Sequence, residues 1–235
     1  MPEQKVGRET VLDAALGLLR ERGETALSAR TVAERAGCSV QPIYSLFGDM
    51  RGLVHALYDH ARAWVAAYNR EHVDDGRNAF EANGLSHLRL ARTERHLFQF
   101  LYLSPHMEAT SFAEVYESVA INGVQQCIEE LGHLSPAAAR ALYLHMIVYT
   151  HGMAAMLVAG AQFSDEELGE RLNEAFTGLL TLVRCGKPWR SRREVVRAML
   201  HVKHRVFQNV CCMMPPRPRR ERGSRMVRCE AGEDV

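Results

Sequence analysis

The sequence predicts an all-α protein, and three features of the 235-residue chain support this fold class. Apolar residues recur every three or four positions through most of the chain, as on one face of a helix. Ser, Asp and Pro residues precede several of these stretches, where they favour helix starts. No stretch alternates between apolar and polar residues, and no Asn-Gly or Asp-Gly turn joins two β-branched runs.

The helices are expected in this order. The first begins before Val11 and ends near Gly23, and two short helices follow between residues 28 and 47. Asp49 is placed to cap a long helix that runs past Tyr68. Further helices are expected at about 79–103, 111–132, 136–160 and 165–184, with a Ser135-Pro136 start signal and a Ser164–Glu167 capping box.

The two short helices have the layout of a helix-turn-helix. Ser28 is placed to cap the first helix, residues 29–36, and Gly37 permits the left-handed conformation of a tight turn. Ser39 is expected to cap the second helix, in which Pro42 falls in the first turn. Ile43 and Phe47, one turn apart, are expected to anchor the second helix on the first.

This segment resembles the tetracycline-repressor (TetR/AcrR) family of transcriptional regulators. The resemblance is carried by Ser28-Ala-Arg-Thr-Val-Ala-Glu-Arg-Ala-Gly-Cys-Ser-Val-Gln-Pro-Ile-Tyr-Ser-Leu-Phe47, followed by Leu53, and covers about residues 8–70. It implies a three-helix DNA-binding domain over residues 8–48 and a connecting helix over 49–74. It also implies a larger helical domain over 75–187 that binds a ligand and dimerises, which leaves a tail over 188–235.

The resemblance and the position of the second helix point to the DNA contacts. Side chains at the start of such a helix approach base edges in the major groove. A glutamine can read adenine with two hydrogen bonds, and short apolar side chains contact thymine methyls. Tyr44 and Ser39 are placed to bind phosphates, although Tyr44 has a core aromatic role as its alternative. The predicted DNA-binding residues are Arg30, Ser39, Val40, Gln41, Tyr44, Ser45 and Arg51.

One position departs from the family pattern. A lysine that contacts the DNA backbone is usual three residues after the aromatic, whereas this chain has Met50 there and Arg51 next. A guanidinium also binds phosphate, so Arg51 can take that role. If Arg51 did not take that role, operator affinity would be lower, or the slope of log affinity against log salt would be shallower by about one unit.

The larger domain is expected to hold an apolar pocket and the dimer interface. Aromatic and methionine side chains form an adaptable pocket wall, but they also fill ordinary cores. The candidate pocket residues are Phe98, Tyr102, Met107, Phe112, Tyr116, Met146 and Tyr149. By the family resemblance, the helices at 136–160 and 165–184 form the dimer interface, with a seam of Leu168, Leu172, Phe176, Leu179, Leu180 and Val183.

Enzyme chemistry is not indicated. His145 and His151 have no Asp or Glu at helical metal-ligand spacing, so lining or sealing a cavity is favoured over metal binding or acid–base catalysis. The sequence predicts no catalytic residues, no metal and no cofactor. Six scattered cysteines, Cys38, Cys127, Cys185, Cys211, Cys212 and Cys229, fit free thiols, with redox sensing by the adjacent pair as the alternative.

Charge is distributed unevenly along the chain. Residues 1–73 carry nine basic and nine acidic side chains, residues 74–183 carry six and fourteen, and residues 184–235 carry fourteen and five. An acidic body argues against non-specific coating of nucleic acid. A basic helix is expected at about 190–210, and from Met213 the Pro- and Arg-rich tail is expected to be disordered, with a solvated or a DNA-attracting role.

The function expected from these features is a homodimeric repressor. It would bind a palindromic double-stranded DNA operator and leave it when a small apolar or aromatic effector binds. An activator or a ligand-independent regulator is the alternative, and an enzyme or transport module with a degenerate DNA-binding fold is another. No signal peptide and no apolar run of about eighteen residues are apparent, so a cytoplasmic location without a membrane partner is expected.

Overall fold

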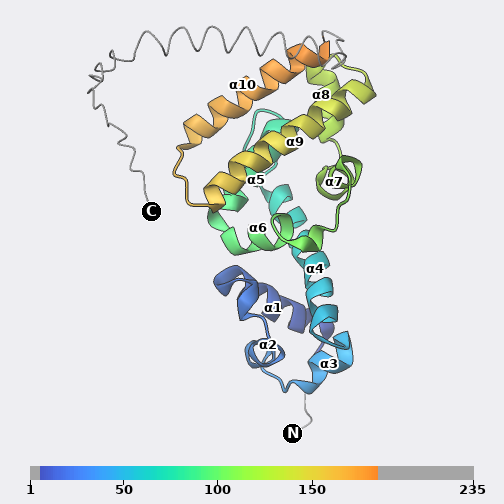
Figure 1. The fold of residues 1–235 in the computed structure, drawn as a ribbon, viewed down its shortest axis with the longest axis vertical. Helices are drawn as coiled ribbons and strands as arrows, with labels where there is room; N and C mark the ends of the chain where they lie inside the picture. The colour runs from blue at the N-terminus through green and yellow to red at the C-terminus, as the bar shows by residue number, and fades with distance from the viewer. Residues whose placement is uncertain (1–5, 185–235) are drawn as a thin grey trace, which may run out of the picture. The chain divides into compact units, whose positions relative to one another are not determined.

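The computed structural model describes residues 6–184, whose regular structure is entirely helical and confirms the all-α prediction (Figure 1). The N-terminal part contains α1 (Arg8–Arg22), a 3₁₀ turn η1 (Glu24–Ala26), α2 (Ala29–Ala36) and α3 (Gln41–Phe47). The long α4 (Met50–Glu71) leads from these helices into the larger helical part.

The larger part follows in chain order and packs around one central helix. It contains α5 (Ala79–Thr93), α6 (Arg95–Tyr102), η2 (Pro105–Met107), α7 (Phe112–Val119), α8 (Val124–Gly132), α9 (Pro136–Val158) and α10 (Asp165–Arg184). Helix α9 contacts α5, α8 and α10, and these contacts bury Leu142, Tyr143 and Ala154 almost completely.

The helix starts depend on the side chains that the sequence indicated. The Ser28 hydroxyl accepts a hydrogen bond from the Thr31 amide at 3.1 Å, and the Asp49 carboxylate accepts one from the Gly52 amide at 2.8 Å. Each bond satisfies an amide that has no partner inside its helix. The reciprocal bonds of the Ser164–Glu167 box are also present, at 2.8 and 3.1 Å.

The cap of α3 differs from the expectation. Helix α3 begins at Gln41 with Val40 as its N-terminal neighbour, and no side chain caps it. Val40 already has helical backbone angles, with φ −71° and ψ −23°, so the turn after Gly37 is one residue longer than expected. The expected capping role of Ser39 is therefore wrong.

Two expected helices are each divided in two. The stretch 79–103 breaks at Glu94, and the stretch 111–132 breaks over residues 120–123, where Gly123 has a φ of +86°. On both sides of each break, apolar residues still recur every three or four positions in the sequence. The apolar spacing therefore did not reveal the two positions at which the backbone leaves the helix.

Helix α9 is long and apolar enough, by length and composition alone, to cross a membrane. Thr150, His151 and Gly152 lie inside this helix, so its apolar residues do not form one uninterrupted run, as the sequence indicated. Its contacts with α5, α8 and α10 explain the apolar composition, because a helix buried on several sides is apolar on several sides.

Several expectations concern residues outside the described part of the chain. These are the helix at about 190–210, the tail from Met213, and four of the six cysteines. Within residues 6–184, Cys38 and Cys127 are both free thiols, as expected.

Candidate nucleic-acid interface and effector cavity

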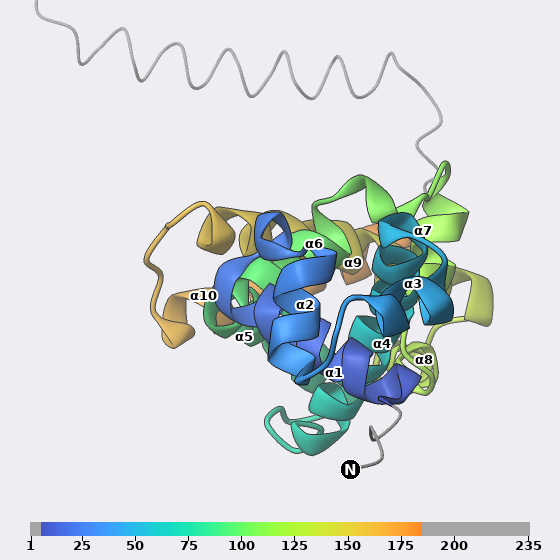
Figure 2. The ribbon, with the colours of Figure 1, turned by 90° about the horizontal axis from the view of Figure 1, so that it is seen from below.

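Helices α2 and α3 form a tight helix-turn-helix around Gly37. This glycine has φ +68° and ψ +33°, the left-handed conformation that the turn requires and that glycine adopts without strain. Val32 on α2 and Ile43 on α3 are both completely buried, so they join the two helices to the core beneath. Seen from below, α2 and α3 lie nearest the viewer (Figure 2).

Most of the predicted DNA-binding side chains are exposed around this turn. Tyr44 is 50% exposed, so its side chain is not a core aromatic. Val40 is the exception, since its side chain is half-buried and packs against the core. The exposed members of the predicted set are Arg30, Ser39, Gln41, Tyr44, Ser45 and Arg51.

Two arginines that the sequence reading did not single out hold this domain together. Arg8 donates to the Leu46 carbonyl at 3.1 Å, and its guanidinium lies 4.5 Å from the centre of the Phe47 ring. Arg35 on α2 makes two 2.6 Å hydrogen bonds to Glu21 on α1. Only the fold brings these pairs together, because each arginine is far in sequence from its partner.

The larger part contains a cavity of about 1390 Å³ lined by residues of α4 to α10. Apolar and aromatic side chains make up much of its wall, which is typical of small-molecule sites. Four of the seven predicted pocket residues line it, namely Tyr102, Met107, Phe112 and Met146.

The other three predicted pocket residues do not line the cavity. Phe98 is completely buried behind His87, and Tyr116 packs edge-on against Tyr143. Tyr149 is 39% exposed on the other side of α9. The helical period explains the position of Tyr149. The α9 residues that line the cavity are Tyr143, Met146, Ile147, Val148, Thr150 and His151, and the side chain at position 149 points away from them.

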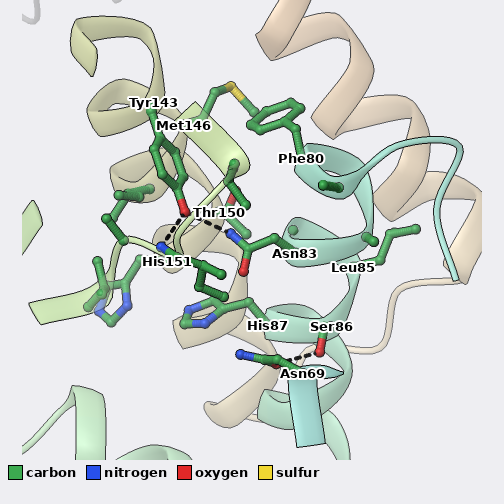
Figure 3. Close-up of a pocket in the computed structure, with 18 of the residues that line it drawn as sticks. Asn69, Phe80, Asn83, Leu85, Ser86, His87, Tyr143, Met146, Thr150 and His151 are labelled. Atoms are coloured by element: carbon green, nitrogen blue, oxygen red, sulfur yellow. Dashed lines mark hydrogen bonds between the residues drawn. The ribbon is translucent and has the colours of Figure 1, made fainter. Parts of the chain in front are cut away.

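Polar side chains on α5 and α9 also face the cavity, and the sequence reading identified only one of them, His151, as a cavity residue (Figure 3). Asn83 and His87 are four residues apart on α5, hence on one face. The Asn83 amide donates to the Tyr143 hydroxyl at 3.2 Å, and this hydroxyl also accepts the Ile121 amide at 3.1 Å. Polar residues at helical spacing in an apolar stretch were the available sequence signal.

An aromatic cluster surrounds His87. Its ring centre lies 5.0 Å from that of Tyr102 and 6.0 Å from that of His151. Burial, with the second imidazole nearby, lowers the pKa of His87 to about 3. Burial also raises the pKa of Tyr102 to about 12, so both side chains are uncharged near neutral pH.

Comparison with known proteins decides the class of the N-terminal domain. Residues 11–57 match the family model of the bacterial regulatory proteins, tetR family. Residues 11–57 therefore form a DNA-binding domain of this family. The protein is therefore a DNA-binding transcriptional regulator, as the helix-turn-helix predicted.

Solved structures of TetR-family regulators share the fold of this protein. A regulator assigned to the same family from a Rhodococcus species is 20% identical with a TM-score of 0.54, over 74% of this chain and 98% of the other. A TetR family transcription regulator from Marinobacter aquaeolei VT8 is 19% identical with a TM-score of 0.50, over 72% and 93% of the two chains. No curated protein matches the sequence.

The start of α4 explains the departure from the family pattern. Met50 is half-buried and packs against the core, whereas Arg51 is exposed. The apolar residue thus contributes to packing, and the guanidinium at the neighbouring position is accessible to solvent.

The DNA-binding helices of the regulator are connected to its cavity in two ways. Helix α4 begins directly after α3, and its residues Tyr58, Val65 and Asn69 line the cavity. Helix α1 contacts α6 as well, with Arg20 bonded to Glu94 at 2.6 and 2.9 Å. The Arg20 guanidinium also lies 4.3 Å from the centre of the Trp64 ring on α4.

Within residues 6–184 no three His, Cys, Asp or Glu side chains gather as a metal site would require. His151 lines the cavity, and His145 lies exposed on α9.

Proposed function

We propose that this regulator is a homodimeric repressor that a small molecule releases from a palindromic operator. The observation that carries the proposal is the shared helix α4, which follows the recognition helix directly and also forms part of the cavity wall. A ligand in the cavity touches this helix. If the ligand binds better when α4 is displaced, it shifts the population away from the DNA-competent arrangement.

The proposed DNA contacts follow from exposure and chemistry. Gln41 and Ser45 on α3, with Arg30 on α2, would read base edges. Tyr44, Ser39 and Arg51 would bind phosphates and so position α3 on the duplex. Val40, being half-buried, can offer only part of its side chain to a thymine methyl.

The proposed dimer interface lies on the outer face of α9 and α10. Tyr149 and Met156 are 39% and 55% exposed and recur at helical spacing with Gly152, where a Cβ would have no neighbour within 4 Å. On α10, Leu182 is 60% exposed. Exposed apolar side chains grouped on one face mark interaction surfaces.

This face replaces the seam expected from the sequence. Leu168 and Leu172 are buried inside their own chain, and Phe176 packs against Phe80 with ring centres 4.9 Å apart. Leu179, Leu180 and Val183 also pack against the core of their own chain. Helix α10 is therefore attached to its own subunit by that seam, which leaves the opposite side for a second copy.

Selection of bound DNA from a random pool tests the proposal. We expect a palindromic consensus whose half-sites are about one helical turn apart, roughly 34–36 Å. A screen for compounds that release this DNA then tests the effector, and deletion of the gene should raise expression from the operator. A fall in expression on deletion, or a consensus without two half-sites, contradicts a dimeric repressor.

The proposed site of action is the cytoplasm, where the DNA is.

A further inference from the structure

The polar part of the cavity wall is built from neutral groups. Figure 3 shows Asn83 and His87 on α5 facing Tyr143, Thr150 and His151 on α9. Asn69 on α4 and Ser86 on α5 adjoin them and bond to each other at 2.7 Å. The wall therefore has a polar side made of amides, hydroxyls and imidazoles, and its remaining lining is largely apolar.

Several of these groups have hydrogen-bonding capacity that the protein does not use. Within residues 6–184, no hydrogen bond is made by the side chains of His87, His151 or Tyr102, although all three line the cavity. The Asn83 carboxamide donates to the Tyr143 hydroxyl and leaves its oxygen without a hydrogen bond inside the described residues. None of these atoms is buried without a partner, so each is accessible from the cavity and can bond to a molecule in it.

The arginines that line the cavity are exposed to solvent, unlike the neutral polar groups on α5 and α9. Arg62, Arg70 and Arg77 are exposed, and Arg77 is paired with Glu81 at 2.9 Å. Arg62 donates to the Ser118 carbonyl at 3.0 Å. Arg62 lies near enough to Tyr102 to act on its charge, but none of the three arginines shifts the pKa of His87. Burial, with His151 nearby, lowers that pKa to about 3, so His87 is neutral near pH 7.

We propose that the cavity selects an uncharged ligand that has an apolar ring or chain skeleton and a hydroxyl, carbonyl or amide group. The polar group of the ligand bonds to Asn83 and His87, and the skeleton lies against the apolar wall. Neutral imidazoles and amides can donate or accept, so they suit a neutral polar group. A carboxylate at this position would exchange its hydration for the neutral groups of Asn83 and His87, while the arginines of the lining are exposed to solvent, which makes its binding unfavourable.

This inference rests on the proposed effector function and is tested separately from it. The probes are pyrene, 1-hydroxypyrene and 1-pyrenecarboxylate, which share one fluorescent skeleton and differ only in the polar group. Their dissociation constants are measured by fluorescence titration of the full chain at pH 7. We expect 1-hydroxypyrene to bind about tenfold more tightly than either other probe, as one neutral hydrogen bond allows.

Two variants identify the wall that makes the selection. In Asn83→Leu and His87→Leu, we expect the preference for 1-hydroxypyrene over pyrene to fall to about twofold or less, with pyrene itself still bound. The control is Gln99→Leu, an exposed polar residue outside the cavity, which should keep the full preference. The comparison of the three probes on the unmodified chain does not depend on either variant folding.

The outcomes separate the two claims. Equal or tighter binding of 1-pyrenecarboxylate overturns the inference, as does an unchanged preference in both cavity variants or no binding of any probe. If 1-hydroxypyrene binds as expected but never releases the selected DNA, the ligand class stands and the effector function fails.

Discussion

Arg20, near the end of α1, donates two hydrogen bonds to the carboxylate of Glu94, the residue at which α5 ends and α6 begins. The bond with Glu94 raises the pKa of Arg20, whose guanidinium also stacks on Trp64 of α4. One arginine of the DNA-binding domain thus contacts both elements through which the cavity can act on it. The pair is therefore a candidate for transmitting ligand binding to the recognition helix.

Glu94→Gln tests this role. The variant keeps the shape of the side chain but removes its charge, and we expect a stability loss of about 1 kcal/mol, because the Arg20 side chain is 36% exposed and solvent weakens the pair. We also expect the ligand-induced loss of DNA affinity to shrink severalfold. Glu21→Gln is the matched control, since it disrupts an equally short arginine pair within the DNA-binding domain. Equal effects of both variants on the ligand response would contradict the assignment.

Tyr44→Phe tests the phosphate contact. The tyrosine hydroxyl is exposed, and its removal should weaken operator binding about tenfold, the effect of one hydrogen bond to a charged group. Fluorescence anisotropy with the selected operator measures the change. Tyr149→Phe, at the exposed tyrosine on α9, should bind DNA as the unmodified chain does. Unchanged binding by the Tyr44 variant means that its hydroxyl does not reach the DNA.

Arg51→Ala tests whether Arg51 replaces the usual lysine. If Arg51 neutralises one phosphate, the slope of log affinity against log salt should become shallower by about one unit. The same titration on Arg171→Ala, in an exposed pair with Glu174 on α10, should leave the slope unchanged. An Arg51 variant with the original slope would exclude this phosphate contact.

Met156→Glu tests the dimer face. Met156 is 55% exposed in the single chain, so the substitution should leave the subunit folded while placing a charge in the interface. Sedimentation should then show a dissociation constant for the dimer raised at least about tenfold. Leu103→Glu, at a leucine that is 45% exposed after α6, is the control and should still dimerise. A Met156 variant as dimeric as the control would place the interface on another surface.

His87 makes stability depend on pH. Burial lowers its pKa in the folded protein to about 3, below the value of about 6.5 in the unfolded chain, so protonation favours unfolding. The neutral side chain imposes no penalty above about pH 6.5, and stability is lost as the pH falls from there toward 3. Between pH 7 and pH 5 the loss should be about 2 kcal/mol.

Denaturant unfolding of His87→Gln at pH 7 and pH 5 measures this contribution. The variant should lose less stability over that interval than the unmodified chain does, by most of the amount due to His87. His133→Asn, at an exposed residue in the left-handed conformation that asparagine tolerates, should behave like the unmodified chain. An identical pH dependence in the His87 variant would mean that folding does not lower the pKa of this imidazole.

Local interactions account for what the sequence predicted well. The bonds of Ser28 and Asp49 to amides three residues ahead, and the left-handed turn at Gly37, involve neighbours in the chain, so the residue types alone indicate them. The breaks at Glu94 and before Gly123 escaped prediction because the apolar spacing continues through them. Glu94 pairs with Arg20, 74 residues away, and no local pattern reports such a partner.

The cavity also combines features that the sequence predicted with features that depend on contacts between distant helices. An apolar wall including Tyr102 and Met146 was expected, since aromatic and methionine residues are abundant in this region. The polar side with Asn83 and His87 was not expected, because it exists only when α5 faces α9. The sequence by itself therefore determined the helical fold class, the helix-turn-helix and the family of that segment, all of which depend on contacts within a few residues. Only the tertiary structure decided which faces of α9 and α10 are buried and which polar groups meet in the cavity, because those outcomes depend on contacts between helices distant in the chain.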